Sequence, residues 1–185
     1  MGQTCEIREV WDHTIEALLA APPKIRHLLD SDFGDEGEFD DEFGGDEDGD
    51  DSDDERLEDH GNSLNIDKAW HAMHFALTGT AWEGDFPWAF LQVGGAQIGD
   101  EDVGYGPARA FTSDEVSAIA DALDTLSQAD FAARLDLQKL ARHSIYPEIW
   151  KNADSIEYVV EYYDRVVEFM RAAARKRKGI LVYHC

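Results

Sequence analysis

Residues 66–79, IDKAWHAMHFALTG, carry polar side chains that could do chemistry at helical spacing: Asp67, His71, His74 and Thr78. On a helix that turns by about 100° per residue, these four fall on one stripe roughly 60° wide, beside a broader apolar face. Two imidazoles one turn apart, with a carboxylate four residues before the first, could begin a metal site or form a base oriented by an acid. The spacing therefore predicts a polar stripe at the border of the core.

The same residues argue against a zinc protease. The H-E-x-x-H signature is missing, because the two histidines have H-x-x-H spacing with no Glu between them. A third ligand would have to come from elsewhere in the chain, and no residue marks it. We therefore expect surface or boundary histidines, one of them hydrogen-bonded internally, and we predict no metal site and no cofactor.

Arg109, in YGPARAF, could form a pocket with this helix. It is an isolated cation that could hold an anionic ligand, or bond internally to an acidic group or a carbonyl. Together with Trp70, His74, Tyr105 and Tyr146 it makes a candidate ligand-binding set. We name no catalytic residue, because GGAQIG and GYG match no phosphate loop and the sequence has no G-x-S-x-G elbow.

Three aromatic residues lie close together after the helix: Trp82, Phe86 and Trp88. They could form an exposed patch for a partner, or pack over the core beneath a long loop. The sequence leaves both possibilities open.

The negative charge of the chain is concentrated in one segment. The formal net charge is −24, and residues 30–59 hold eighteen acidic residues against one basic residue, Arg56, which is −17. With five glycines and few apolar residues, this segment cannot bury enough surface to offset its chain entropy. We predict a disordered acidic insert over residues 30–60 within a single domain spanning residues 1–185. Its spacing fits no EF-hand calcium loop.

This insert suggests a function. It could only keep the protein soluble, or it could attract a basic protein, whereas it would repel nucleic-acid phosphates. It could also fold back onto the RKRKG cluster of residues 175–179. We expect a non-catalytic interaction module whose acidic segment engages a basic partner, as inhibitors and immunity proteins do. The alternative is a small ligand-binding protein or enzyme with a pocket around His74 and Arg109.

The rest of the chain indicates an α+β domain in the cytoplasm. The 185 residues suit one domain, and MGQTCEIREV lacks the features of a signal peptide. No apolar run reaches the roughly 20 residues of a membrane span. Cys5 and Cys185 are expected to be free thiols, although the strand-like ends QTCEIREV and GILVYHC could lie side by side.

Helices are expected between these two terminal strands. One is expected to begin with a capping box, TSDE, and the longest with Asp154 as its cap. Residues 88–93, WAFLQV, could be a strand or a helical turn. The predicted helices cover residues 12–20, 23–29, 65–78, 113–126, 128–143 and 155–177.

Three stretches, IDKAWHAMHFALTGT, YGPARAFTSDEV and IYP at residues 145–147, resemble the YfbM-like family of small bacterial proteins of unknown function. The family's helix motif matches Trp70, His74, Phe75, Leu77, Thr78 and Gly79. The resemblance covers most of the chain in the same order and implies an α+β domain with a strand at each end. It places the acidic run at a variable connection, leaves His71 outside the shared motif and implies no reaction.

Overall fold

The computed structural model describes residues 2–30, 59 and 61–185. These residues form an α+β fold on an antiparallel sheet with the strand order β2-β1-β5-β4-β3. The strands are β1 (Cys5–Val10), β2 (Ser63–Asn65), β3 (Ala96–Gln97), β4 (Arg109–Phe111) and β5 (Gly179–His184). The helices are α1 (Asp12–Ala20), α2 (Lys24–Asp30), the 3-10 turn η2 (Asp67–Ala69), α3 (Trp70–Thr78), α4 (Ser113–Asp124), α5 (Gln128–Arg134), α6 (Leu137–Arg142) and α7 (Asp154–Arg175).

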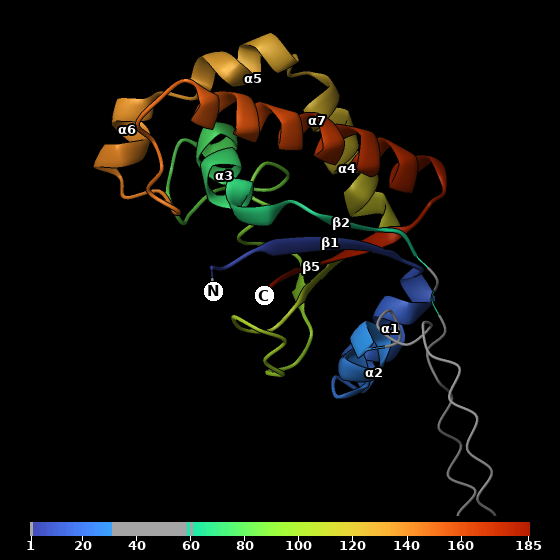
Figure 1. Cartoon of the computed structure of the whole chain (residues 1–185). Helices are drawn as coiled ribbons and strands as arrows, with labels where there is room; N and C mark the ends of the chain where they lie inside the picture. Colours follow the sequence, from blue (N-terminus) through green and yellow to red (C-terminus); the bar gives the residue numbers. More distant parts are fainter. Residues whose placement is uncertain (1, 31–58, 60) are drawn as a thin grey trace, which may run out of the picture.

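The two terminal strands are neighbours in the sheet (Figure 1). β1 and β5 pair from Cys5 opposite His184 to Val10 opposite Gly179, so the side-by-side arrangement of the ends is confirmed. Cys185 continues this pairing opposite Thr4, through its N–H to the Thr4 carbonyl at 3.1 Å. Because successive residues point to opposite faces of a sheet, the two cysteines lie on opposite faces, and both are free thiols.

Helices cover both faces of the sheet (Figure 1). Helices α3 to α7 lie on one face, where Ile7, Phe111 and Val182 join their core. Helices α1 and α2 cover part of the other face, where Val10 and Leu181 are buried. The alternation of side chains along the strands therefore supplies two cores, one on each side of the sheet.

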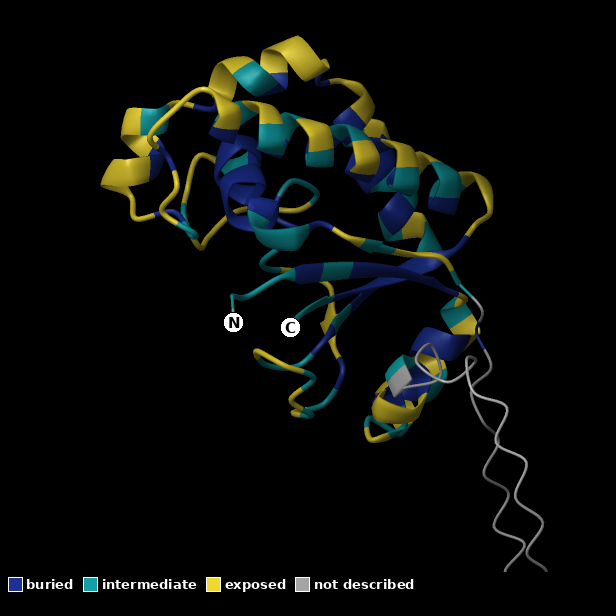
Figure 2. Ribbon diagram, viewed as in Figure 1, coloured by how far each residue is buried: buried dark blue, intermediate teal, exposed yellow. Residues whose placement is uncertain are grey.

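The helix termini follow local capping chemistry only in part. Thr112 and Glu115 form the predicted capping box at the start of α4. The predicted cap at Asp154 is wrong, because Asp154 is already helical and Ala153 precedes it without a side-chain hydrogen bond. Along α7, apolar residues spaced three and four apart form a buried stripe that faces the core. The outer side of the helix is exposed, as Figure 2 shows.

Two predicted helices are interrupted. The 128–143 segment divides into α5 and α6, because Leu135 is extended and Asp136 caps the second helix at the N–H groups of Gln138 and Lys139. The 65–78 segment begins with the end of β2 and with η2 before α3 starts at Trp70. Residues 88–93 form a helical turn, with the Val93 N–H bonded to the Ala89 carbonyl at 2.9 Å.

The predicted acidic insert lies outside the described residues except at its two ends. Asp30 is the last residue of α2. Asp59 is buried, with 4% of its surface exposed, so at this position the predicted insert belongs to the folded domain.

Candidate functional site

His71 is a buried structural group. Its Nδ1 accepts a hydrogen bond from the Tyr146 N–H at 3.0 Å, and its Nε2 donates to the Ala81 carbonyl at 2.8 Å. Both nitrogens are occupied, so the ring is neutral with its proton on Nε2. Burial lowers the pKa of His71 below its ordinary value. The ring therefore joins α3 to the segments at Ala81 and Tyr146.

His74 is fully buried one turn later. Its Nε2 donates to the Glu83 carbonyl at 3.1 Å, while its Nδ1 has no hydrogen-bond partner among the described residues. Burial lowers the pKa of His74 to about 4, and the charge of Arg109 adds to this effect. The prediction of surface or boundary histidines is wrong, because the segment after α3 covers the polar stripe.

Arg109 and His184 lie on the sheet face that α3 covers. The register pairs Arg109 with Val182, and His184 lies two residues further along the same strand. Arg109 donates from Nη2 to the Leu91 carbonyl at 2.9 Å and from Nη1 to the Phe90 carbonyl at 3.2 Å. Burial lowers the pKa of Arg109 to about 10. Its observed partners are therefore carbonyls, one of the two internal arrangements predicted.

His184 resembles His74 in its bonding. Its Nε2 donates to the Leu91 carbonyl at 3.2 Å, and its Nδ1 has no hydrogen-bond partner in the described part of the chain. Burial lowers the pKa of His184 to about 4, with the charge of Arg109 as the second cause. Sequence reasoning missed this residue, and the pairing of Cys5 with His184 is what brings it onto the face that α3 covers.

The other predicted site residues divide between the interior and the surface. Trp70 is fully buried, with its ring centroid 4.5 Å from His184 and 6.1 Å from Tyr146. Tyr105 is 56% exposed in a separate loop, and its N–H donates to the His184 carbonyl at 2.9 Å. The structure thus gathers four predicted residues around α3 and leaves the Tyr105 side chain outside.

The predicted aromatic group is split. Trp82 is 55% exposed and Phe86 is 47% exposed, whereas Trp88 packs against the larger core. Trp82 also contacts His71, with ring centroids 4.3 Å apart. Both expected arrangements are therefore present within one loop.

Two surface cavities flank the C-terminal end of α3. One, of about 530 Å³, lies beside the loop that carries Glu83 and Asp85. The other, of about 400 Å³, has Arg134 and Lys139 in its lining. Leu77 and Thr78 line both, and neither His74 nor Arg109 lines either.

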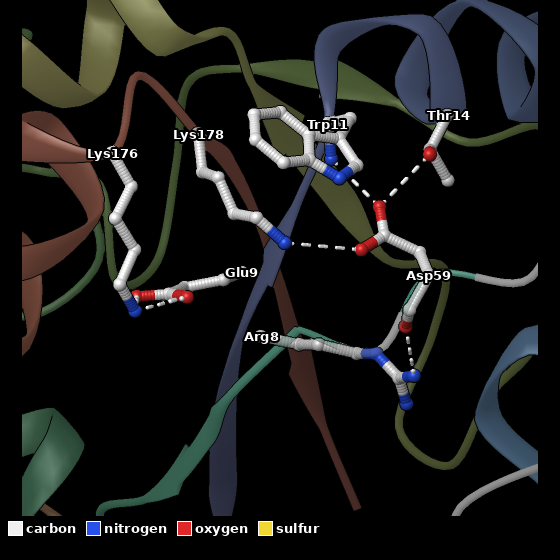
Figure 3. Close-up of polar contacts among 7 residues, drawn as sticks. All are labelled: Arg8, Glu9, Trp11, Thr14, Asp59, Lys176 and Lys178. Atoms are coloured by element: carbon white, nitrogen blue, oxygen red, sulfur yellow. Dashed lines mark hydrogen bonds and ion pairs between the residues drawn. The ribbon is translucent and has the colours of Figure 1, made fainter.

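Asp59 is the centre of a buried polar cluster at the other end of the sheet (Figure 3). Its Oδ2 accepts hydrogen bonds from the Trp11 N–H at 2.7 Å and the Thr14 hydroxyl at 2.9 Å. Its Oδ1 is 3.2 Å from Lys178 Nζ, and its carbonyl accepts from Arg8 at 2.9 Å. Because Trp11 precedes α1, Asp59 caps that helix from a distant part of the chain.

Two basic residues after α7 form ion pairs at this end of the sheet. Lys178 lies 4.4 Å from the Trp11 ring centroid as well as beside Asp59. Lys176 Nζ is 2.9 Å from the carboxylate of Glu9, a buried residue of β1. Nothing in the sequence distinguishes Asp59 from the other acidic residues. Arg8 and Glu9, however, are charged residues within a buried strand, and such residues need internal partners.

The described part of the chain holds no group of three or more His, Cys, Asp or Glu side chains placed to bind a metal ion. Among its helices, none combines the length and apolar character that crossing a membrane requires.

The whole chain matches a known fold. It is similar to the crystal structure of YfbM from Escherichia coli, a protein of unknown function, with 19% identity and a TM-score of 0.66 over 97% of this chain and 98% of that one. This likeness concerns the fold alone. No curated protein sequence matches the chain. The family model described as a domain of unknown function, DUF1877, matches residues 1–183, and the chain therefore belongs to this YfbM-like family.

Proposed function

We propose that the protein is a non-catalytic interaction module of the cytoplasm whose acidic segment engages a basic protein partner, in the manner of an inhibitor or immunity protein. The observation that carries this proposal is the distribution of charge. Residues 31–58 have sixteen acidic side chains and one basic side chain, a formal charge of −15. The rest of the chain has a formal charge of −9.

The basic cluster of residues 175–178 supplies few free cations that could neutralise this segment. In the basic cluster after α7, Lys176 is paired with Glu9 and Lys178 with Asp59. Arg175 and Arg177 are exposed and have no ion pair among the described residues. Two free cations in this cluster against fifteen negative charges favour an external basic partner over a fold-back of the segment onto residues 175–178.

The physical consequences are specific. The strongly acidic segment attracts basic surfaces over a distance set by ionic strength, about 8 Å at 0.15 M salt. It raises the association rate with a basic protein and slows that with nucleic acid. Binding should therefore weaken steeply as salt is added.

The alternative function, a ligand site around His74 and Arg109, has one observation in its favour. The buried Nδ1 atoms of His74 and His184 have no hydrogen-bond partner among the described residues. Against it, Arg109 and the Nε2 atoms of both histidines are already bonded to carbonyls of the loop after α3. These bonds make the cluster a support for that loop.

The proposal is tested with a variant in which the Asp and Glu residues of 32–55 are replaced by Asn and Gln. This variant keeps the segment length and keeps Asp59, whose removal would disturb the fold. We expect the full chain to retain a basic protein from host lysate at low salt and the neutral variant to lose it. Equal retention by both proteins, at unchanged melting temperature, would contradict the proposal.

A further inference from the structure

The cavity of about 530 Å³ beside the C-terminal end of α3 has the features of a cation site. Its volume falls within the roughly 300–1,000 Å³ of small-ligand sites. Its walls carry hydroxyls, carboxylates and an indole: Thr78, Thr80, Glu83, Asp85 and Trp88, above Leu77. We call it the Glu83–Asp85 cleft.

The charge of the cleft is negative and uncompensated. Glu83 and Asp85 are exposed, and neither has an ion pair among the described residues. No basic residue lines the cleft. The end of α3 adds partial negative charge from its last carbonyls, and the last turn of this helix carries no basic side chain. A cation would therefore meet two carboxylates and a helix C-terminus at once.

The wall that presents these carboxylates is held in place. The Glu83 carbonyl accepts hydrogen bonds from His74 Nε2 at 3.1 Å and from the Thr80 hydroxyl. Thr78 Oγ1 in turn donates to the His74 carbonyl at 2.8 Å. A Cβ at Gly84 would lie 2.7 Å from Thr78 Cγ2, so this loop packs directly on the helix end. Buried His74 thus fixes the position of Glu83 rather than meeting a ligand itself.

The loop that forms this wall also carries three aromatic side chains. Trp88 lines the cleft, while Trp82 and Phe86, in the same loop, are 55% and 47% exposed. Aromatic faces attract ammonium and guanidinium groups and pack against the aliphatic stem of a long side chain. The carboxylates and the Trp88 ring, which line the cleft together, favour a basic side chain with an alkyl stem.

We propose that the Glu83–Asp85 cleft receives a lysine or arginine side chain of a basic protein partner. This inference rests on the proposed function, because it assigns to the same partner a second contact on the folded domain. The acidic segment supplies long-range attraction, and the cleft supplies a directional contact at one residue of the partner.

The test uses a fluorescein-labelled peptide of alternating lysine and glycine and its arginine counterpart, with fluorescence anisotropy as the readout. The cleft variant is Glu83→Gln with Asp85→Asn, which preserves shape and leaves the main-chain bonds of residue 83 intact. The matched control is Glu16→Gln with Asp121→Asn, which removes the same charge from exposed positions on α1 and α4. The neutral-segment variant described above completes the set.

We expect the cleft variant to bind at least one of the two peptides about tenfold more weakly than the control does, since it loses charge-assisted contacts. Binding of the corresponding citrulline peptide, whose side chains are uncharged, should not depend on the cleft. If the cleft variant matches the control while the neutral-segment variant loses binding, the cleft proposal is overturned and the proposed function stands. If only the cleft variant loses binding, the proposed function fails and the cleft stands.

A second measurement excludes an indirect effect. Amide chemical shifts of residues 78–88 should move on titration with N-acetyl-lysine amide or N-acetyl-arginine amide in the neutral-segment variant, whose long-range attraction has been removed. Shifts confined to other parts of the chain with both ligands would overturn the cleft proposal independently of the peptide results.

Discussion

Replacing Asp59 by Ala should destabilise the fold severely, although sequence alone would count this residue among the expendable acidic side chains. The substitution leaves Lys178 Nζ buried without its carboxylate and removes the acceptor of the Trp11 N–H and the Thr14 hydroxyl. Breaking a buried ion pair by deleting one partner costs about 3–5 kcal/mol. The lost contacts are at the start of α1 and in the segment that leads into β5.

Urea unfolding followed by circular dichroism measures this loss of unfolding free energy directly. In a separate thermal melt, the melting temperature should fall by about 10 °C, since a domain of this size loses about 2–4 °C per kcal/mol. Asp59→Asn separates the terms, because its amide oxygen can still accept from Trp11 and Thr14 but carries no charge for Lys178. We expect about half the loss for this variant.

Lys178→Met completes a double-mutant cycle. If the pair is coupled as its geometry indicates, the double variant Asp59→Ala with Lys178→Met should lose less stability than the sum of the two single variants. The surface substitution Asp121→Ala serves as reference and should change stability by less than about 0.5 kcal/mol. An Asp59→Ala protein as stable as this reference would refute the reasoning.

Three further predictions concern the residues around α3 and α4. Because the pKa of His74 is about 4 in the folded protein and 6.5 ordinarily, the neutral ring stabilises the fold above pH 6.5, and this contribution is lost as pH falls towards 4. Between pH 6.5 and pH 5 the free energy of unfolding should fall by about 2 kcal/mol more in the natural protein than in His74→Gln, measured by urea titration at each pH. Equal pH dependence of the two proteins would rule this out. Arg109→Met removes the side-chain donor of the Phe90 and Gly94 carbonyls and one of the two donors to the Leu91 carbonyl, and should cost about 3 kcal/mol in urea unfolding, whereas a loss under 1 kcal/mol would show that water replaces the guanidinium. Thr112→Ala removes one half of the capping box of α4 and should cost about 1 kcal/mol by the same measurement, with no change meaning that the helix start is held by tertiary contacts alone.

The parts of the fold that sequence predicts are those fixed by local pattern. The alternation in β1, the β-branched run of β5 and the three-and-four repeat of α7 each identify their element within a few residues. β3 and β4, by contrast, have two and three residues, in a glycine-rich stretch without periodicity. β4 is a strand because β5 offers it a partner, and β3 pairs in turn with β4; no local signal records either pairing.

The candidate site shows the same division. A helical wheel correctly separates Trp70 from His71 and His74, but it cannot show that the segment after α3 folds over the histidine stripe. The sequence indicates that Arg109 is an isolated cation, but it does not show that the loop at residues 90–94 supplies carbonyls as its partners. Asp59 could not be singled out, because its burial depends on Arg8 and Lys178, which approach from opposite ends of the chain.

The pairing of β1 with β5 also determines when the chain can fold. Val10 pairs with Gly179, so the centre of the sheet forms only after almost the whole described chain has left the ribosome. Contacts between residues so far apart in sequence fold slowly, since the loop-closure entropy is lost before the contact is gained. A chain interrupted before β5 would lack the central strand of the sheet, whose side chains belong to both cores. Such a fragment would expose apolar surface on both sides, which quality-control proteases can recognise.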